Sequence, residues 1–188
     1  MRTALRHIAI IQTGIFAKPV TEGDIVYLQA KHFDESGGLQ ATLHPDLKAD
    51  SLTNKHLLKP GDVLFAAKGA KNFAACYESK NLPAVASTSF FVIRVQREFS
   101  SKILPEFLTW FLNEPGTQQL LKSQAIGTSI VSISKSVLEA LEVSIPNLQT
   151  QKAILKITQL RNREKNLKQQ IETLREQQIQ QQLIKAIK

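Results

Sequence analysis

The last forty residues, 149–188, constrain the fold more than any other part of the chain, because they contain no glycine and no proline. They carry ten glutamines, and leucine and isoleucine recur among them at helical spacing. This composition predicts one long helix, which at about 1.5 Å per residue would extend roughly 60 Å. A body of about 145 residues does not need so long a helix for its own core. We therefore expect the helix to hold something outside the body.

The length of the chain, 188 residues, suits one domain followed by an extension. We assign residues 1–146 to a globular body large enough to bury a core, and residues 147–188 to the long helix. Asn147 is a competent N-cap for that helix. No stretch has the apolar length of a signal peptide or a membrane span. We therefore expect a cytoplasmic protein that does not associate with membranes.

The net charge of +8 lies mostly on the long helix rather than on the body. Residues 149–188 hold nine lysines and arginines against three glutamates, a net of +6, which leaves +2 for residues 1–148. A solvated helix face explains this excess, and direct contact with phosphate is the less favoured alternative. Charge alone therefore does not indicate DNA binding.

Short elements, separated by glycine, proline and charged residues, make up the body. A helix that begins at Pro105 presents an apolar face to the core, and a second helix begins at Pro115. Residues 35–38 predict a turn, because they contain two consecutive glycines. Strands that come first and helices that come later indicate an α+β fold. Apolar runs predict the strands at residues 26–28, 63–67, 74–77 and 90–95.

The sequence contains no recognisable catalytic constellation. A phosphate loop, a dinucleotide-binding fingerprint, a nucleophile elbow and a zinc-protease helix are all absent. Cys76 is the single cysteine, and we expect it to be a buried structural thiol. The four histidines lack the spacing of metal ligands. We therefore predict no catalytic residue, no metal site and no cofactor.

Two loops carry polar groups that suit contact with DNA. The first follows a predicted strand and places two lysines and an amide around a glycine. An ordinary hairpin turn explains this loop equally well. The second loop offers hydroxyl groups and backbone amides near the predicted helices. The candidate residues are Lys68, Lys71 and Asn72 in the first loop, and Thr128 and Ser129 in the second.

Several short segments follow one another along nearly the whole chain. They are residues 5–9 (LRHIA) with Gly14, 23–28 (GDIVYL), 58–65 (LKPGDVLF) with Lys68-Gly69, 86–94 (ASTSFFVIR), 104–108 (LPEFL), 127–130 (GTSI) and 141–151 (LEVSIPNLQTQ). No single segment is specific. Their ordered succession resembles the specificity subunits of type I restriction-modification systems, and more narrowly one of the two target-recognition halves of such a subunit.

The resemblance implies a globular target-recognition domain that reads one half of a split sequence in double-stranded DNA. It also implies that the long helix sets the distance between two such domains and docks methyltransferase subunits, and through them the restriction subunit. The specificity subunit of this family has no catalysis of its own. Asn147 and Thr150 stand where the family usually has a proline and an acidic residue, so a contact made by that acid is not expected here.

The usual subunit of this family has two recognition domains and two such helices, whereas this chain has one of each. We therefore expect a homodimer in which two helices pair antiparallel and carry the domains at opposite ends. An apolar stripe with 3–4 spacing supplies the seam, although Glu164 interrupts it and the register drifts beyond its end. Packing of the stripe against the chain's own body is the alternative. The candidate partner contacts are Ile157, Leu160, Leu167, Ile171, Leu174 and Leu183.

We expect the DNA to be read by loops, because the body has no basic helix that could enter a groove. Beyond the two loops named above, Lys18, Lys31 and Arg94 are further candidates for DNA contact. Two other functions agree with the same sequence. A scaffold or inhibitor could occupy a methyltransferase without binding DNA, and a truncated, silent cassette would yield no product in cells.

Overall fold

The computed structural model of the chain describes residues 1–34, 37–39, 43–49, 54–69, 72–78, 83–125 and 132–187. The chain divides into two units, Met1–Leu148 and Gln149–Lys188. We call the first unit the body, and each unit is described by itself.

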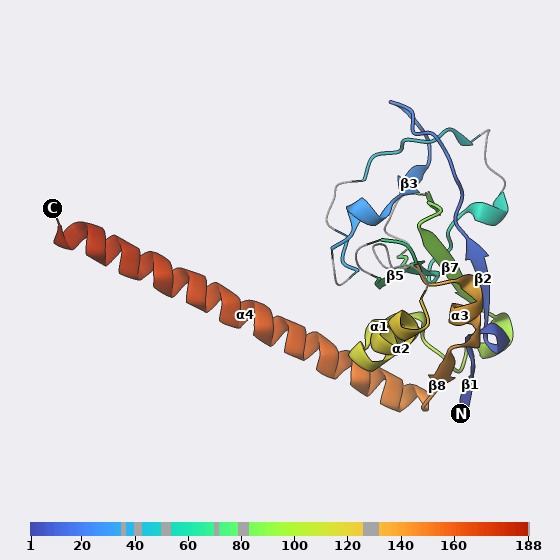
Figure 1. The fold of residues 1–188 in the computed structure, drawn as a ribbon. Helices are drawn as coiled ribbons and strands as arrows, with labels where there is room; N and C mark the ends of the chain where they lie inside the picture. The colour runs from blue at the N-terminus through green and yellow to red at the C-terminus, as the bar shows by residue number, and fades with distance from the viewer. Residues whose placement is uncertain are drawn as a thin grey trace. The chain divides into compact units, whose positions relative to one another are not determined.

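A four-stranded antiparallel sheet lies at the centre of the body, as far as the described residues show (Figure 1). The strand order is β2-β7-β4-β5, so β7 is hydrogen-bonded on both sides. Ile93 of β7 lies opposite Ile11 of β2 and opposite Val63 of β4. β-Branched and aromatic residues are frequent in β2, β4 and β7, as is typical of buried sheets, whereas β5 consists of two alanines and a cysteine. The strands span Ala9–Thr13 (β2), Val63–Ala66 (β4), Ala74–Cys76 (β5) and Phe90–Val95 (β7).

Two smaller strand pairs extend the body. Strands β3 and β6 pair in parallel and are buried along their whole length. Strands β1 and β8 pair antiparallel and join the start of the chain to the end of the body. The backbone N–H of Ile145 extends this pairing by donating to the carbonyl of Met1 at 2.7 Å. The strands span Arg2–Ala4 (β1), Val26–Leu28 (β3), Ala84–Ala86 (β6) and Glu142–Ser144 (β8).

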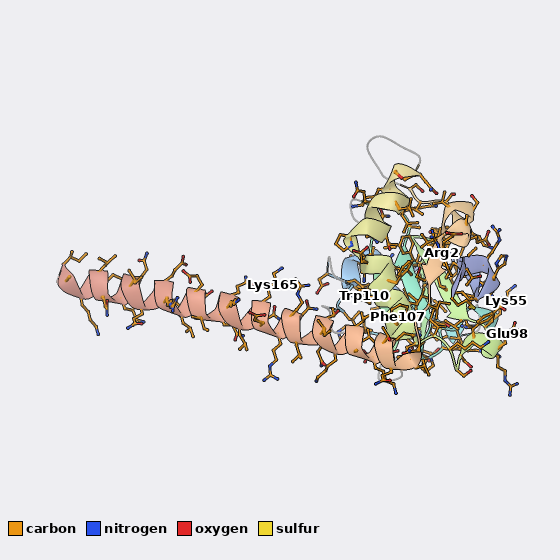
Figure 2. All side chains as sticks on the ribbon, turned by 90° about the horizontal axis from the view of Figure 1, so that it is seen from below. Arg2, Lys55, Glu98, Phe107, Trp110 and Lys165 are labelled. Atoms are coloured by element: carbon orange, nitrogen blue, oxygen red, sulfur yellow. The ribbon has the colours of Figure 1, made fainter. Side chains whose placement is uncertain are left out.

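Helices α1, α2 and α3 follow the sheet strands in the body. Pro105 and Pro115 stand in the first turn of α1 and α2, where the missing N–H of proline costs no hydrogen bond. Helix α1 buries Phe107, whose ring lies 5.6 Å from that of Trp110 (Figure 2). The helices span Pro105–Asn113 (α1), Pro115–Ser123 (α2) and Lys135–Ala140 (α3), with short 3-10 helices at Leu5–His7 (η1), Ala30–His32 (η2), Asn54–His56 (η4) and Arg97–Phe99 (η5).

One side chain ties the end of α1 to the edge strand β5. Asn113 accepts a hydrogen bond from the backbone N–H of Ala74 at 2.7 Å and donates one to its carbonyl at 2.8 Å. The amide thus makes the pair of bonds that a neighbouring strand would make. This clamp satisfies backbone groups that an open sheet edge would otherwise present.

Three aromatic rings connect the sheet to the segment after β3. Phe33, Phe73 and Phe90 lie with ring centroids 5.6–6.0 Å apart in tilted or edge-to-face arrangements. Phe90 begins β7 and Phe73 precedes β5, so this cluster lies at the end of the sheet where both strands start. The cluster therefore holds η2, just before Phe33, close to that end of the sheet.

The second unit is a single helix, α4, which spans Leu148–Ala186 (Figure 1). The predicted long helix is therefore confirmed. Gln151 is its one buried residue among those described. No helix in the described ranges combines the length and the apolar character needed to cross a lipid bilayer. The side chains of the predicted stripe, Ile157, Leu160, Leu167, Ile171 and Leu174, are 49–63% exposed, and Leu183 is 59% exposed.

The α+β fold expected from the sequence is confirmed. The four predicted strands correspond to β3, β4, β5 and β7, and the two predicted helices correspond to α1 and α2. Strands β1, β2, β6 and β8 and helix α3 are not among the predictions. Of the predicted turn, Gly37 and Gly38 are described, and Gly37 has a φ of +83°. Residues 35–36 lie outside the described ranges.

Candidate nucleic-acid interface

Four strand ends meet at one end of the central sheet. Ala66, the last residue of β4, lies opposite Phe90, the first residue of β7. Thr13, the last residue of β2, lies opposite Phe91, and Ala74 at the start of β5 lies opposite Phe65. The segments that follow β2 and β4, and those that precede β5 and β7, therefore converge here. We call this region the loop end of the sheet.

The predicted loop that starts at Lys68 lies at the loop end. The side chain of Lys68 is exposed, and Gly69 has a φ of +142°, a backbone conformation that favours glycine. The N–H of Ala67 donates to the carbonyl of Ser89 at 2.9 Å, which joins the loop to the turn before β7. Lys68 is thus an exposed cation on a backbone held at its base.

A segment far along the chain pairs with the same loop. Ser132 forms an isolated antiparallel bridge with Lys68, and the N–H of Ile133 donates to the carbonyl of Ala67 at 3.0 Å. The chain that directly follows the second predicted loop therefore lies beside the first loop. Lys71, Thr128 and Ser129 themselves lie outside the described residues, so they stay predictions.

Asn72 closes the Lys68 loop from within and is not an exposed contact. Its side chain is 8% exposed, and its Nδ2 donates to the carbonyl of Ala66 at 2.9 Å. The N–H of Ala66 in turn donates to the carbonyl of Phe73 at 2.8 Å, which completes the closure. We therefore remove Asn72 from the candidate DNA contacts, because its side chain is buried and its Nδ2 serves the loop, while its Oδ1 is buried without a hydrogen-bond partner among the described residues.

Arg94 is also removed from the candidate DNA contacts, because its guanidinium is committed to a buried carboxylate. Its Nε and Nη2 donate to the two oxygens of Asp62 at 2.7 and 2.5 Å, and Nη2 also donates to the carbonyl of Leu57 at 3.2 Å. Asp62 is 1% exposed and also accepts from the N–H of Lys59 at 2.7 Å. These hydrogen bonds to Asp62 raise the pKa of Arg94 above its ordinary value.

Lys31 and Lys18 are both exposed. Lys31 lies on η2, which follows β3, and β3 reaches the loop end because the N–H of Ser87 donates to the carbonyl of Leu28 at 2.9 Å. Burial, with a further contribution from the charge of Lys31, lowers the pKa of the neighbouring His32. Lys18 lies on the segment that leaves the sheet after β2.

Two polar residues at the loop end were not singled out as contacts in the sequence. Thr88 is exposed on the turn between β6 and β7, and the hydroxyls of Ser87 and Ser89 on either side of it are 2.6 Å apart. Ser132 joins them through its bridge with Lys68. Thr88 lies inside the segment of residues 86–94 described above, but its exposure depends on the turn. The loop end thus combines two exposed lysines with hydroxyl groups.

The described residues offer few groups for metal binding or nucleophilic catalysis. In the described parts of the chain, no cluster of three or more histidine, cysteine or acidic side chains is placed to hold a metal ion. Burial, aided by the charge of Glu106, raises the pKa of the Cys76 thiol to about 12. A thiol with so high a pKa is a poor nucleophile at neutral pH.

Comparison with known proteins assigns the chain to a family. The family described as "Type I restriction modification DNA specificity domain" matches residues 20–174, well over half of the chain. The chain belongs to this family. The resemblance that the sequence alone suggests is therefore confirmed. A comparison with curated proteins gives no significant match.

Solved specificity subunits share the fold of this family member. The HsdS subunit from Thermoanaerobacter tengcongensis aligns with a TM-score of 0.62 and 23% identity over 90% of this chain and 44% of its own. The type I restriction-modification S subunit from M. genitalium aligns with a TM-score of 0.58 and 15% identity over 85% and 38%. A structure from work on assembly and conformational transition of the type I R-M system aligns with a TM-score of 0.64 and 16% identity, over 90% of this chain and 40% of its own.

The specificity-domain chain thus spans about two fifths of the length of each of these structures. At identities of 15–23%, the likenesses establish a shared fold, whereas the family assignment comes from the match over residues 20–174. The chain is accordingly a member of the type I restriction modification DNA specificity domain family, with a body and a long helix.

Proposed function

We propose that this chain reads one half-site of a split DNA sequence for a type I restriction-modification complex, while the methylation and cleavage chemistry belongs to partner subunits. The observation that carries the proposal is the family match over residues 20–174, together with a loop end of exposed lysines and hydroxyls on the body. Phosphate-binding cations and hydroxyls on converging loops are the groups by which proteins position themselves on DNA.

Lys68 is the leading contact in this proposal. The backbone at Ala67 and Lys68 is fixed by pairing with the segments at Ser89 and Ser132, so Lys68 gains little order on binding. Lys31 and Lys18 are further phosphate contacts, and Lys71, Thr128 and Ser129 remain predicted contacts of the same interface. In this proposal the chain binds DNA while it is bound to methyltransferase subunits. The methyltransferase subunits in turn bring in the restriction subunit.

The DNA contact is tested with Lys68→Gln in the complex with methyltransferase subunits. We expect weaker binding to every duplex and a plot of log affinity against log salt whose slope is smaller by about one. Lys59→Gln is the matched control, because Lys59 is an exposed lysine just before the other end of β4. Equal losses in the two variants would remove the loop end from the proposal. A complex that assembles without any salt-dependent DNA affinity would favour a scaffold or inhibitor.

We further propose that α4 pairs with the α4 of a second copy. Its apolar stripe follows a heptad pattern, in which Leu160, Leu167 and Leu174 occupy d positions and Ile157 and Ile171 occupy a positions. All five side chains are about half exposed or more in the single chain. Burial of such a stripe against a like stripe removes apolar surface from water in both copies. This supports a helix-to-helix contact as the use of α4.

Charge favours an antiparallel pair over a parallel one. A parallel pair in register would face Glu164, the remaining a position, with its own copy inside the seam, and would set Arg163 beside Lys168 of the second copy. An antiparallel pair that faces Ile157 with Leu174 places Glu164 opposite Leu167 instead. Glu164 can then keep its bond to Lys168 of the same helix, at 2.7 Å. The antiparallel pair avoids two buried carboxylates in contact.

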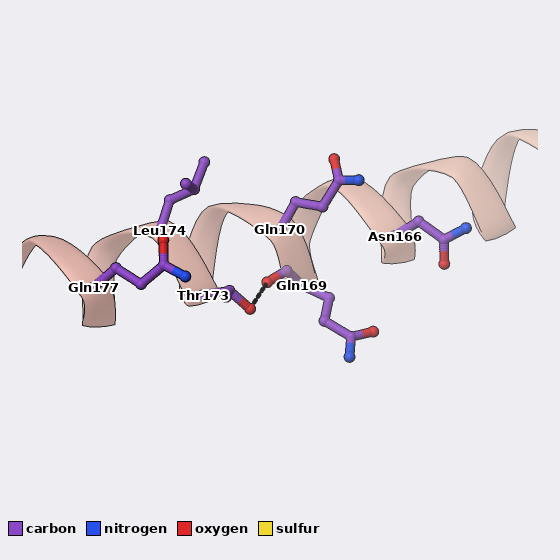
Figure 3. Close-up of a pocket in the computed structure, with 6 residues that line it drawn as sticks. All are labelled: Asn166, Gln169, Gln170, Thr173, Leu174 and Gln177. Atoms are coloured by element: carbon purple, nitrogen blue, oxygen red, sulfur yellow. Dashed lines mark hydrogen bonds between the residues drawn. The ribbon is translucent and has the colours of Figure 1, made fainter.

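The flank of the stripe agrees with this arrangement. Figure 3 shows amide and hydroxyl side chains beside Leu174 on α4, none of them charged. In the antiparallel register, Arg163 lies near Gln170 of the second copy, and a glutamine can accept a hydrogen bond from an arginine. The opposite flank brings Arg161 near Lys168 of the second copy, which costs stability at low salt. The flank lining consists of Asn166, Gln169, Gln170, Thr173 and Gln177.

Disulfide trapping tests the pairing and its direction. In a Cys76→Ser background, Leu160→Cys mixed with Ile171→Cys should form a cross-linked dimer, because these positions face each other in the antiparallel register. Leu160→Cys alone should not cross-link, because two copies of this position would lie about 16 Å apart along the helices. Efficient cross-linking of Leu160→Cys alone would indicate a parallel pair. Sedimentation of the wild-type chain as a monomer would refute the proposed homodimer.

The methylation pattern of the source genome tests the whole proposal. Single-molecule sequencing of methylated bases, with the gene intact and deleted, should show loss at one split, palindromic motif, because two identical domains read the same half-site twice. Loss at an asymmetric motif would mean that the second domain belongs to another chain. An unchanged methylome would leave the specificity function without support.

A further inference from the structure

Phe16 is exposed although the remaining aromatic side chains are not. Its side chain is 78% exposed, whereas every other phenylalanine, tyrosine and tryptophan in the described residues is buried or half-buried. Phe16 follows β2 directly on the segment that leaves the loop end of the sheet. A single exposed apolar side chain is ordinary on a protein surface, so a role for Phe16 has to come from its surroundings.

The backbone on both sides of Phe16 is fixed by one buried tyrosine. The hydroxyl of Tyr27, which is 3% exposed, donates to the carbonyl of Ile15 at 2.9 Å and accepts from the N–H of Ala17 at 3.4 Å. The N–H of Ile15 also donates to the carbonyl of Ala86 at 2.9 Å. Phe16 is therefore held outward on an ordered backbone, and a partner that contacts it pays little conformational entropy.

Glycine at position 14 brings this segment close to the loop end. A Cβ at Gly14 would lie 2.1 Å from the carbonyl oxygen of Ser87, so only glycine allows the two backbones to approach so closely. The N–H of Gly14 donates to the carbonyl of Phe90 at 3.0 Å. The chain just before Phe16 thus contacts the same turn to which the Lys68 loop is joined.

Cations accompany Phe16 on this surface. Lys18 is exposed two residues further along, and the side chain of Lys55 lines a small depression together with His56, Thr13 and Ile15. Figure 2 shows Lys55 at the surface of the body. Negative charges lie on the same segment as well. Glu22 and Asp24 are exposed, and the carboxylate of Asp46 accepts from the N–H of Tyr27 at 2.7 Å.

An aromatic ring among cations suits duplex DNA better than a protein partner. Nucleic-acid sites combine cations for phosphates with aromatic or apolar side chains that meet the bases. A protein interface would need a broad apolar centre with few charges. Val20, 41% exposed, is the other large apolar side chain exposed on this segment. The composition of this surface therefore favours DNA.

We propose that Phe16 is a base-contacting residue of this protein, which meets the edge or face of a base in a DNA groove while Lys18 and Lys55 contact phosphates. The inference rests on the proposed function, since it assigns one specificity-determining contact to the interface at the loop end. Phe16 discriminates among sequences by apolar contact, either with a thymine methyl group or at a base step that unstacks easily.

Phe16→Ala and Lys18→Gln separate base contact from phosphate contact. The probes are a duplex selected from a random library by the wild-type complex with methyltransferase subunits, and a scrambled duplex of the same composition. Phe16→Ala should weaken binding of the selected duplex about tenfold, with little change for the scrambled duplex and an unchanged salt slope. Lys18→Gln should weaken both duplexes alike and reduce the slope. Leu120→Ala, at an exposed leucine of α2, is the control and should change neither.

The outcomes distinguish this inference from the proposed function. A wild-type complex that selects no duplex would refute the proposed function itself. A wild-type complex that selects a duplex, with Phe16→Ala binding it as tightly, would refute the base contact alone. Equal losses of affinity for both duplexes in Phe16→Ala would also refute the base contact. Unchanged DNA binding together with weaker assembly onto the methyltransferase would refute it as well, and would make Phe16 a protein-docking residue. Thermal unfolding should be unchanged in Phe16→Ala, because the side chain is exposed.

Discussion

Replacement of Arg94 by methionine should destabilise the body, although Arg94 is a cation that could be taken for a DNA contact. The substitution keeps most of the aliphatic stem and removes the guanidinium. Asp62, 1% exposed, would then keep the hydrogen bond from the N–H of Lys59 and lose both bonds from Arg94. A buried carboxylate without its cation is the most costly product of such a change.

The size of the effect follows from the burial of the two partners. Breaking a buried ion pair by removing one partner costs about 3–5 kcal/mol. The side chain of Arg94 is 29% exposed, so water can reach the space it leaves, and the lower end of about 3 kcal/mol applies. For a chain of this size, that loss lowers the melting temperature by roughly 6–12 °C. The double variant Asp62→Asn/Arg94→Met should lose less than the sum of the single losses, by about 1–3 kcal/mol.

Urea unfolding followed by circular dichroism measures these losses. Arg97→Met is the matched control, because Arg97 is exposed on η5, and its unfolding free energy should change by less than about 0.5 kcal/mol. An Arg94→Met variant as stable as Arg97→Met would refute the structural account of the ion pair. DNA affinity, measured below the unfolding transition, should be the same for Arg94→Met and wild type. A loss there would return Arg94 to the DNA interface.

Three further predictions concern other parts of the body. The Cys76 thiol, with a pKa raised by burial to about 12, should react slowly with iodoacetamide at pH 8 and rapidly in urea. Because the unfolded thiol titrates near 9.0, the contribution of Cys76 to stability should be full below pH 9 and be lost as the pH rises toward 12. Gly14→Ala should cost about 1–3 kcal/mol in urea unfolding, because its Cβ would meet the carbonyl of Ser87, and a loss below 0.5 kcal/mol would contradict the close approach. Asn113→Ala should cost about 1–3 kcal/mol and speed amide hydrogen exchange at Ala74; unchanged exchange there would show that the clamp does not hold β5.

The sequence alone determined the elements whose causes are local. Helix α4 follows from forty residues without glycine or proline, and α1 and α2 follow from a proline in the first turn and an apolar face. Strands β4 and β7 are long enough for their apolar runs to be recognised. The family was also recognisable from the order of short segments, because local sequence motifs can be read without knowing which residues they contact in the folded protein.

The tertiary structure decided which residues meet and which of them remain exposed. Strand β1 exists because it pairs with β8, more than a hundred residues later, and a three-residue segment carries no such signal by itself. Asn72 and Arg94 look like exposed polar contacts in the sequence, but their side chains are engaged by hydrogen bonds to Ala66 and Asp62. Phe16 is exposed, and the bonds from Tyr27 fix the backbone on both sides of it, which the sequence does not indicate. Exposure is a property of the neighbours that folding brings together, and the order of residues along the chain does not contain it directly.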